Sequence, residues 1–146
     1  DELYSNSRSG GFGEEVQRRI LLGTYVLSSG YYDAYYERAK RVRGVIAADM
    51  RRAFASVDYI ASPTAPFTAF GIGEKAQDPK QMYLTDKFTT SVNLSGDAAI
   101  SVPCGFDRDG MPIGLQLIAP AFEENRLFDL GHWFQNATDH SQVVPK

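Results

Sequence analysis

The stretch that decides the fold is AISVPCGFDRDGMPIGLQLI, residues 99–118. It contains two apolar runs, Ala99–Val102 and Ile113–Ile118, with Asp-Arg-Asp-Gly at 107–110 between them. Asp and Gly favour tight turns, because they tolerate backbone conformations that other residues avoid. The stretch therefore predicts two antiparallel strands joined as a hairpin.

The residues before the hairpin predict a helix and a further strand. Asp78-Pro79 is typical of a helix start, since proline suits the first helical position, and the helix is expected to cover residues 79–90. Val57–Ala61 is a short apolar run that predicts a buried strand. The following segment, Ser-Pro-Thr-Ala-Pro at 62–66, is expected to end that strand, because its two prolines lack N–H donors.

After the hairpin, residues 123–136 predict a last amphipathic helix. Apolar side chains recur along it at helical spacing. The residues expected on its inward face are Leu127, Leu130 and Trp133.

The N-terminal residues predict a loop followed by two helices. Residues 1–13 are polar and rich in glycine, so they are expected to form a loop. Residues 14–29 carry apolar side chains at spacings of three and four, which predicts a helix, with Gly30 as its C-cap. Residues 31–54 predict one long amphipathic helix. We find no internal repeat or linker, so the sequence predicts one mixed α/β unit.

Composition excludes several classes of protein. The net charge of -3 provides no basic field to attract a nucleic acid. The single cysteine cannot form a disulfide within the chain, which fits the cytoplasm. No apolar run is long enough for a membrane span. The chain begins at Asp1 rather than Met, so we expect a piece of a longer protein.

The sequence contains no convincing nucleophile and no metal-binding motif. There is no G-x-S-x-G elbow, P-loop or H-E-x-x-H. A dyad of Cys104 and His132 is conceivable, but a buried apolar role for Cys104 and a partly exposed position for His132 are the simpler interpretations. No lysine lies in the Gly/Ser-dense surroundings of a Ser–Lys mechanism.

Several motifs resemble the C-terminal third of the amidase signature family, and within it the A subunits of tRNA-dependent amidotransferases. They are Phe12-Gly13-x-Glu15-Val16-x-Arg18-Arg19-Ile20, Leu27-Ser28-Ser29-Gly30-Tyr31-Tyr32-Asp33-Ala34-Tyr35-Tyr36, Ser62-Pro63-Thr64-Ala65-Pro66, Asn93-Leu94-Ser95-Gly96, Val102-Pro103-Cys104-Gly105 and Pro112-Ile113-Gly114-Leu115-Gln116. The resemblance covers nearly the whole chain. It implies the C-terminal portion of the amidase signature fold, an α/β fold whose mixed sheet is covered by amphipathic helices, and it makes residues 1–146 part of one domain.

The resemblance also implies a function. The full protein hydrolyses glutamine with a Ser–cis-Ser–Lys triad in its N-terminal half, which these 146 residues do not include, so the chain alone is expected to be inactive. The ammonia serves the conversion of Glu-tRNA(Gln) to Gln-tRNA(Gln). It passes to a B subunit that uses ATP and magnesium, while a C subunit completes a cytoplasmic heterotrimer. Charged tRNA is expected to bind through the complex, and this chain itself is expected to hold no metal or cofactor.

By position, the resemblance assigns Arg19 to the glutamine α-carboxylate and Asp86 to its α-amino group. A guanidinium can bind a carboxylate through two parallel hydrogen bonds. The alternative for Arg19 is a surface ion pair with Glu15, one helical turn earlier. Asp86 is expected about two turns into its helix, where Asp is unfavourable, and its alternative is a solvent-facing acid beside Lys87.

Two other interpretations stay open at this stage. The chain can belong to another amidase that acts on an apolar or aromatic amide, which needs neither Arg19 nor Asp86. It can also be a docking module without activity. One departure from the family pattern is Asp97-Ala98 in place of Leu-Pro, which is either a surface substitution or a perturbation of the following strand.

Overall fold

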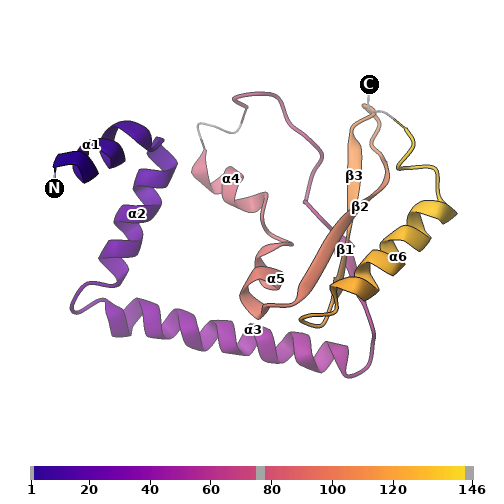
Figure 1. Cartoon of the computed structure of the whole chain (residues 1–146), viewed down its shortest axis with the longest axis horizontal. Coiled ribbons are helices and arrows are strands. Elements are labelled where there is room, and N and C mark those ends of the chain that lie inside the picture. The colour runs from indigo at the N-terminus through magenta and orange to yellow at the C-terminus, as the bar shows by residue number, and fades with distance from the viewer. Residues whose placement is uncertain (1, 75–77, 144–146) are drawn as a thin grey trace. The chain divides into compact units, whose positions relative to one another are not determined.

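The computed structural model describes residues 2–74 and 78–143. The chain divides into two compact units, residues 1–43 and residues 44–146 (Figure 1). The α/β class expected from the sequence is confirmed, because the chain contains both helices and the strands of a sheet. Whether the two units belong to one domain stays a prediction. Within the described ranges, no helix is both long and apolar enough to cross a membrane.

The centre of the second unit is an antiparallel sheet, three-stranded over the described residues, in the order β1-β3-β2. Strand β2 (Ala98–Phe106) and strand β3 (Pro112–Ala119) form the hairpin that residues 99–118 predict. Strand β1 (Ile60–Pro63) pairs with the other edge of β3. The register places Gln116 of β3 opposite Ser62 of β1 and Ser101 of β2.

The hairpin turn forms as its composition predicts. The Asp107 carboxylate oxygen Oδ1 accepts hydrogen bonds of 2.9 Å from the backbone N–H groups of Asp109 and Met111. Gly110 has φ of +80°, which side chains rarely allow. Thr68, from the loop after β1, donates a 2.6 Å hydrogen bond to Oδ2 of Asp107. The turn is therefore bound both to its own backbone and to a distant loop.

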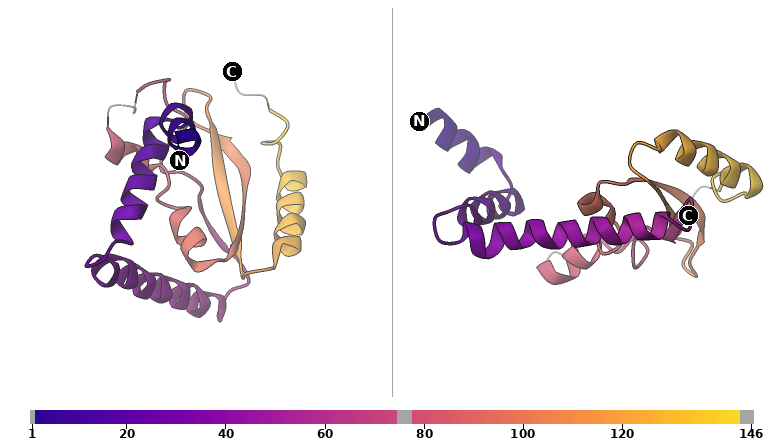
Figure 2. Two further views of the ribbon diagram at one scale, coloured as in Figure 1. Left: turned by 60° about the vertical axis from the view of Figure 1, so that its left-hand side comes forward. Right: turned by 90° about the horizontal axis from the view of Figure 1, so that it is seen from below.

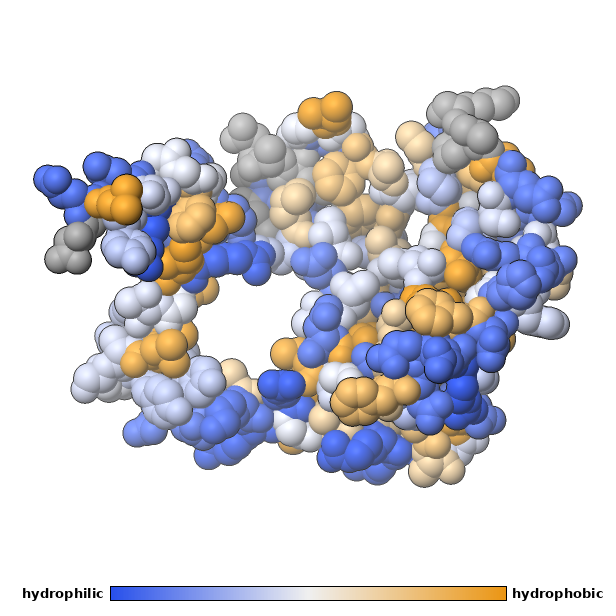
Figure 3. Space-filling model, viewed as in Figure 1, coloured by the Kyte–Doolittle hydropathy of each residue, from blue (hydrophilic) through white to orange (hydrophobic). Residues whose placement is uncertain are grey.

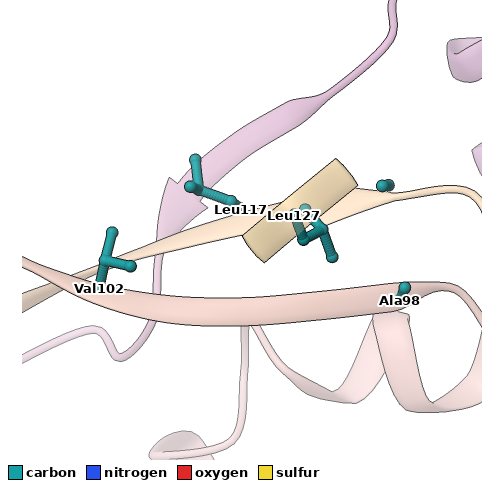
Figure 4. Packing of buried hydrophobic residues seen from close by; sticks show 5 residues of the cluster. Ala98, Val102, Leu117 and Leu127 are labelled. Atoms are coloured by element: carbon teal, nitrogen blue, oxygen red, sulfur yellow. The ribbon is translucent and has the colours of Figure 1, made fainter. Parts of the chain in front are cut away.

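Helix α6 (Glu124–Ala137) covers one face of the hairpin (Figures 1 and 2). Its Leu127 is fully buried against Ala98, Val102 and Leu117 of the two strands (Figure 4). Gly131 permits this close approach, because a Cβ there would lie 2.7 Å from Cδ1 of Ile100.

The inward face predicted for α6 is wrong at one residue. Leu127 and Leu130 pack on the core, but Trp133 is 64% exposed, and Phe134 packs there instead. Successive helix positions are 100° apart, so a shift of one residue changes the face.

Two of the expected elements have different bounds. The strand predicted at 57–61 lies at Ile60–Pro63 and is only half-buried. Pro63 is tolerated because β1 is an edge strand and the missing N–H faces away from β3. The pairing continues just beyond it, where the N–H of Thr64 donates to the carbonyl of Gly114 at 2.9 Å.

The helix predicted at 79–90 is broken in two. Helix α4 (Pro79–Leu84) begins as expected, since the Asp78 side chain accepts from the N–H groups of Lys80 and Gln81. Residues 85–89 then form a turn, and helix α5 (Thr90–Ser95) follows. Asp86 therefore lies in a turn rather than inside a helix, which corrects the expectation and removes the propensity penalty attached to it.

The first unit is helical throughout most of its length. Helix α1 (Glu2–Gly11) occupies residues expected to form a loop, so that prediction is wrong. Helix α2 (Glu14–Val26) is confirmed, although it ends before the expected Gly30. The long helix expected from residue 31 begins as a π-helical segment, η1 (Tyr32–Glu37), and continues as α3 (Arg38–Phe54) across the boundary between the units. Apolar side chains are visible on the surface of the first unit (Figure 3), and Leu21 is 71% exposed.

Candidate substrate-binding site

Arg19 lies in the second turn of α2, one helical turn after Glu15. The carboxylate of Glu15 binds both neighbouring arginines, with Oε1 2.9 Å from Nε of Arg19 and Oε2 2.8 Å from a terminal nitrogen of Arg18. The ion pair that was the alternative for Arg19 is therefore present. The Arg19 side chain is 64% exposed, and exposed ion pairs contribute only about 0–1 kcal/mol, so a ligand carboxylate can compete with Glu15.

Asp86 is exposed in the turn between α4 and α5. Its backbone carbonyl accepts from the N–H of Thr90 at 2.9 Å and from the Thr90 hydroxyl at 2.7 Å. Its carboxylate accepts from the Thr85 hydroxyl at 3.3 Å, and within the described ranges no Lys or Arg forms an ion pair with it. The turn thus presents an acidic group that can accept hydrogen bonds from a ligand ammonium.

The pairing of Arg19 with Asp86 across one ligand stays a prediction. Arg19 belongs to the first unit and Asp86 to the second. For a glutamine bound by both, the guanidinium and the carboxylate should lie within roughly 10 Å of each other in one pocket.

A row of polar side chains crosses the sheet face opposite α6, and it was not predicted from the sequence. Gln116 is 3% exposed, and its Nε2 donates to Oγ of Ser62 at 3.0 Å and to the carbonyl of Phe88 at 3.1 Å. The hydroxyls of Thr64 and Ser101 lie 2.6 Å apart. Each hairpin strand has one hydroxyl or amide residue within a largely apolar run, Ser101 and Gln116, and this was the signal that could have identified the face.

Gly114 makes room for the contact between Thr64 and Ser101. A Cβ at Gly114 would lie 2.8 Å from each of the two hydroxyl oxygens and 3.1 Å from Cβ of Thr64. Real Cβ atoms do not approach other atoms this closely, so a side chain here would force the two strands or the two hydroxyls apart. Glycine at 114 is therefore a packing requirement of the polar face.

Two hollows lie beside this row in the second unit. One of about 510 Å³ is bounded by residues 63–69 and by the hairpin residues Ser101 and Gly114. The other, of about 350 Å³, has polar walls that include Asn93, Asp97 and Gln116. The carboxylate oxygen Oδ2 of Asp97 is shielded from solvent and has no hydrogen-bond partner among the described residues. Asp97 is thus half-buried rather than a surface substitution, and β2 begins directly after it at Ala98.

The Cys104–His132 dyad has no support in the described residues. Cys104 is half-buried in β2, at the bulge between Pro103 and Gly105. His132 is exposed on α6, where its Nε2 lies 2.9 Å from Nδ2 of Asn136, and no hydrogen bond joins it to Cys104 in the described part of the chain. Among the residues that the structure describes, neither Cys104 nor His132 has the partner that activates a nucleophile.

The tyrosines near η1 contact one another. The ring centroids of Tyr25 and Tyr31 are 4.3 Å apart, and those of Tyr32 and Tyr36 are 4.9 Å apart. A hydrogen bond with Tyr31 raises the pKa of Tyr25. All four tyrosines are exposed, so they form an aromatic cluster on the surface of the first unit.

Comparisons with known proteins identify the class. The sequence pattern of the Amidase family matches residues 1–128. The chain is 55% identical over 146 residues to the A subunit of the glutamyl-tRNA(Gln) amidotransferase of Halorhodospira halophila, and 56% identical over 145 residues to that of Dechloromonas aromatica. These alignments cover 100% and 99% of the chain.

A solved structure is similar over most of the chain. The A subunit of the glutamyl-tRNA(Gln) amidotransferase of Thermotoga maritima aligns with 86% of the chain at 46% identity, with a TM-score of 0.64. The chain belongs to the amidase family, and its resemblance to the C-terminal part of the A subunits of tRNA-dependent amidotransferases is supported. It spans 30% of the length of the curated relatives and 27% of the Thermotoga chain.

Proposed function

We propose that this chain is part of the glutamine-hydrolysing subunit of an amidotransferase that converts Glu-tRNA(Gln) to Gln-tRNA(Gln). The observation that carries the proposal is the 55% identity, over the full chain, to the A subunit of the glutamyl-tRNA(Gln) amidotransferase of Halorhodospira halophila. Relatives this similar keep the same arrangement of backbone and side chains, so a shared substrate follows naturally from a shared site.

In this function the chain recognises glutamine. Arg19 binds the α-carboxylate through its fork of N–H donors, and Asp86 binds the α-amino group, each at roughly 2.7–2.9 Å. The two opposite charges orient the ligand, because its carboxylate and ammonium hang from a single carbon. The nucleophile comes from residues of the full subunit outside these 146.

The partners belong to the same proposal. The ammonia passes to a B subunit that binds ATP and magnesium, and a C subunit completes the cytoplasmic complex. Charged tRNA binds through the complex rather than through this chain, whose net charge of -3 provides no overall basic field to attract it.

The experiment is a substrate comparison with the full-length subunit in its complex. We expect glutamine to be hydrolysed with a much higher kcat/KM than an aromatic amide such as benzamide, and Asp86→Asn to reduce that preference. A preference for benzamide, unaffected by Asp86→Asn, would assign the chain to another amidase instead.

The chain by itself provides a second test. Residues 1–146 alone should release no ammonia from glutamine above a buffer blank, because the described part of the chain shows no activated nucleophile. Ammonia release by the purified chain would contradict this expectation, and loss of that activity in Cys104→Ala would then identify the nucleophile.

A further inference from the structure

The buried amide of Gln116 connects the sheet to the turn that carries Asp86. Gln116 is 3% exposed in the middle of β3, where an apolar side chain would avoid the cost of burying a polar group, about 1–3 kcal/mol when unpaired. Both hydrogens of its Nε2 are used, one by Oγ of Ser62 and one by the carbonyl of Phe88. A carbonyl can only accept, so the amide must present its nitrogen to Phe88.

Phe88 is two residues beyond Asp86 in the same turn. The N–H of Lys87 donates to the carbonyl of Leu84 at 3.2 Å, and the N–H of Thr90 donates to the carbonyl of Asp86 at 2.9 Å. These bonds make residues 84–90 one hydrogen-bonded segment. Fixing the carbonyl of Phe88 therefore also restricts where the Asp86 side chain can lie.

The segment has few other contacts that fix it, because only Thr85, Phe88 and Thr89 of the turn are half-buried. Helices α4 and α5 have six residues each, and isolated helices of this length are unstable in water. The described side chains of α4 are all exposed, so this helix adds little packing. Val92 of α5 is buried, but it lies beyond the turn.

We propose that Gln116 is a positioning residue that holds the 85–89 turn, and with it Asp86, in place for binding the α-amino group of the substrate. The inference rests on the proposed function, which gives Asp86 that role. Gln116 itself does not touch the substrate. It acts through the backbone of Phe88, across 28 positions of the sequence.

A substrate pair separates positioning from a general loss of structure. Glutaramate has the carboxylate and the side-chain amide of glutamine but lacks the α-amino group. A residue that acts through Asp86 affects glutamine hydrolysis more than glutaramate hydrolysis, whereas a general structural defect reduces both equally. The readout is the ratio of the two kcat/KM values, measured by ammonia release with the full-length subunit in its complex.

The variant is Gln116→Met, which keeps the side-chain length but removes both donors. The ratio should fall by about tenfold, the scale of one hydrogen bond, with glutaramate hydrolysis nearly unchanged. The matched control is Ser62→Ala, which removes the other acceptor of Gln116 and should leave the ratio within about twofold. Equal losses for both substrates in Gln116→Met would overturn the proposal.

Two further measurements decide the remaining cases. Asp86→Asn should lower the same ratio, and if it does not, the assignment of Asp86 in the proposed function fails rather than the anchoring by Gln116.

Hydrogen exchange then tests the anchor directly, because the amides of Lys87 and Thr90 should exchange faster in Gln116→Met. If Gln116→Met does not fold, Gln116→Asn replaces it in both assays, since its shorter side chain cannot reach Phe88. Unchanged exchange at both amides would rule out the anchor.

Discussion

The two units of the chain differ in how far their apolar side chains are buried. In the second unit, Leu127 is fully buried, and Val102 and Leu117 are 5% and 6% exposed. In the first unit, α2 and η1 contain no buried residue, and Leu21 is 71% exposed. Burial of apolar surface is the main stabilising term in folding. The second unit therefore has a core of its own, and the described part of the first unit depends on local contacts.

The difference concerns how much each unit contributes to stability. The local contacts of the first unit are exposed ion pairs, such as those of Glu15, and contacts between partly exposed tyrosine rings. Contacts of this kind contribute little each. We therefore expect substitutions of buried residues in the second unit to lower the free energy of unfolding, and substitutions of exposed residues in the first unit, such as Arg19, to leave it nearly unchanged.

The largest effect is expected from Leu127→Ala in the second unit. Removing a fully buried leucine should lower the free energy of unfolding by about 2–5 kcal/mol, because it leaves a cavity between α6 and the hairpin. Urea denaturation of the full-length subunit measures it. Leu21→Ala, the same change in the first unit, should cost under about 0.5 kcal/mol. An equal cost at Leu21 would break the comparison, since it would mean that Leu21 is covered in the complete protein.

Arg19→Lys should act on substrate use and not on stability. A lysine is a single point charge and cannot reproduce the bidentate fork. The kcat/KM for glutamine should therefore fall, and the fall should correspond to a loss of about 1.5–3 kcal/mol in transition-state binding. Arg18→Lys is the matched control, because residue 18 points roughly 100° away on α2. Unchanged kinetics in Arg19→Lys would leave only the surface ion pair with Glu15.

Gly114→Ala tests the packing of the polar face in the second unit. The new Cβ would collide with Thr64 and Ser101, so the free energy of unfolding should fall by about 1–3 kcal/mol. Gly44→Ala provides the contrast, because nothing lies within 4 Å of a Cβ there and the residue is inside α3. That variant should be neutral or more stable by about 0.5–1 kcal/mol. A tolerated alanine at 114 would show that the strands can separate freely.

The smallest effect concerns pH. The hydrogen bond from Thr68, together with those from the turn backbone, lowers the pKa of Asp107. Because the folded pKa is below the unfolded value, this stabilisation is present above the unfolded pKa, near 3.8, and is lost as pH falls through the folded pKa. The gap in melting temperature between wild type and Asp107→Asn should therefore be constant well above the unfolded pKa, near 3.8, and should narrow as pH falls below it. Asp109→Asn should show no such gap, and a gap that persists at low pH would exclude the carboxylate as its source.

Local sequence patterns predicted the elements whose signals are short-range. Asp and Gly at 107–110 specified the hairpin turn, and apolar spacing specified α2 and α6. The interruption of the predicted helix at residues 85–89 was not predictable in this way. There the backbone carbonyl of Phe88 accepts a hydrogen bond from the side chain of Gln116, 28 positions away. The phase of α6 was equally ambiguous, because Trp133 and Phe134 are adjacent and only packing against β2 and β3 selects Phe134.

In the candidate site too, some features were predicted from the sequence and others appeared only in the structure. Arg19 and Asp86 were assigned by position from the family resemblance, and their shared ligand stays a prediction. Gln116 lies in one of the motifs that carry that resemblance, but its amide acquires a role only when β1, β3 and the 85–89 turn meet around it.

By itself, the sequence determined the family and the helical or strand character of most segments, and through the family resemblance it predicted Arg19 and Asp86 as glutamine-binding residues. The character of the segments follows from residue types at fixed spacings along the chain. Only the tertiary structure decided that Asp86 lies in a turn, that Gly114 must lack a side chain, and that Gln116 is buried with both N–H donors satisfied. Each of these depends on contacts between segments that are distant in sequence, and a buried polar group has no defined energy until its partners are in place.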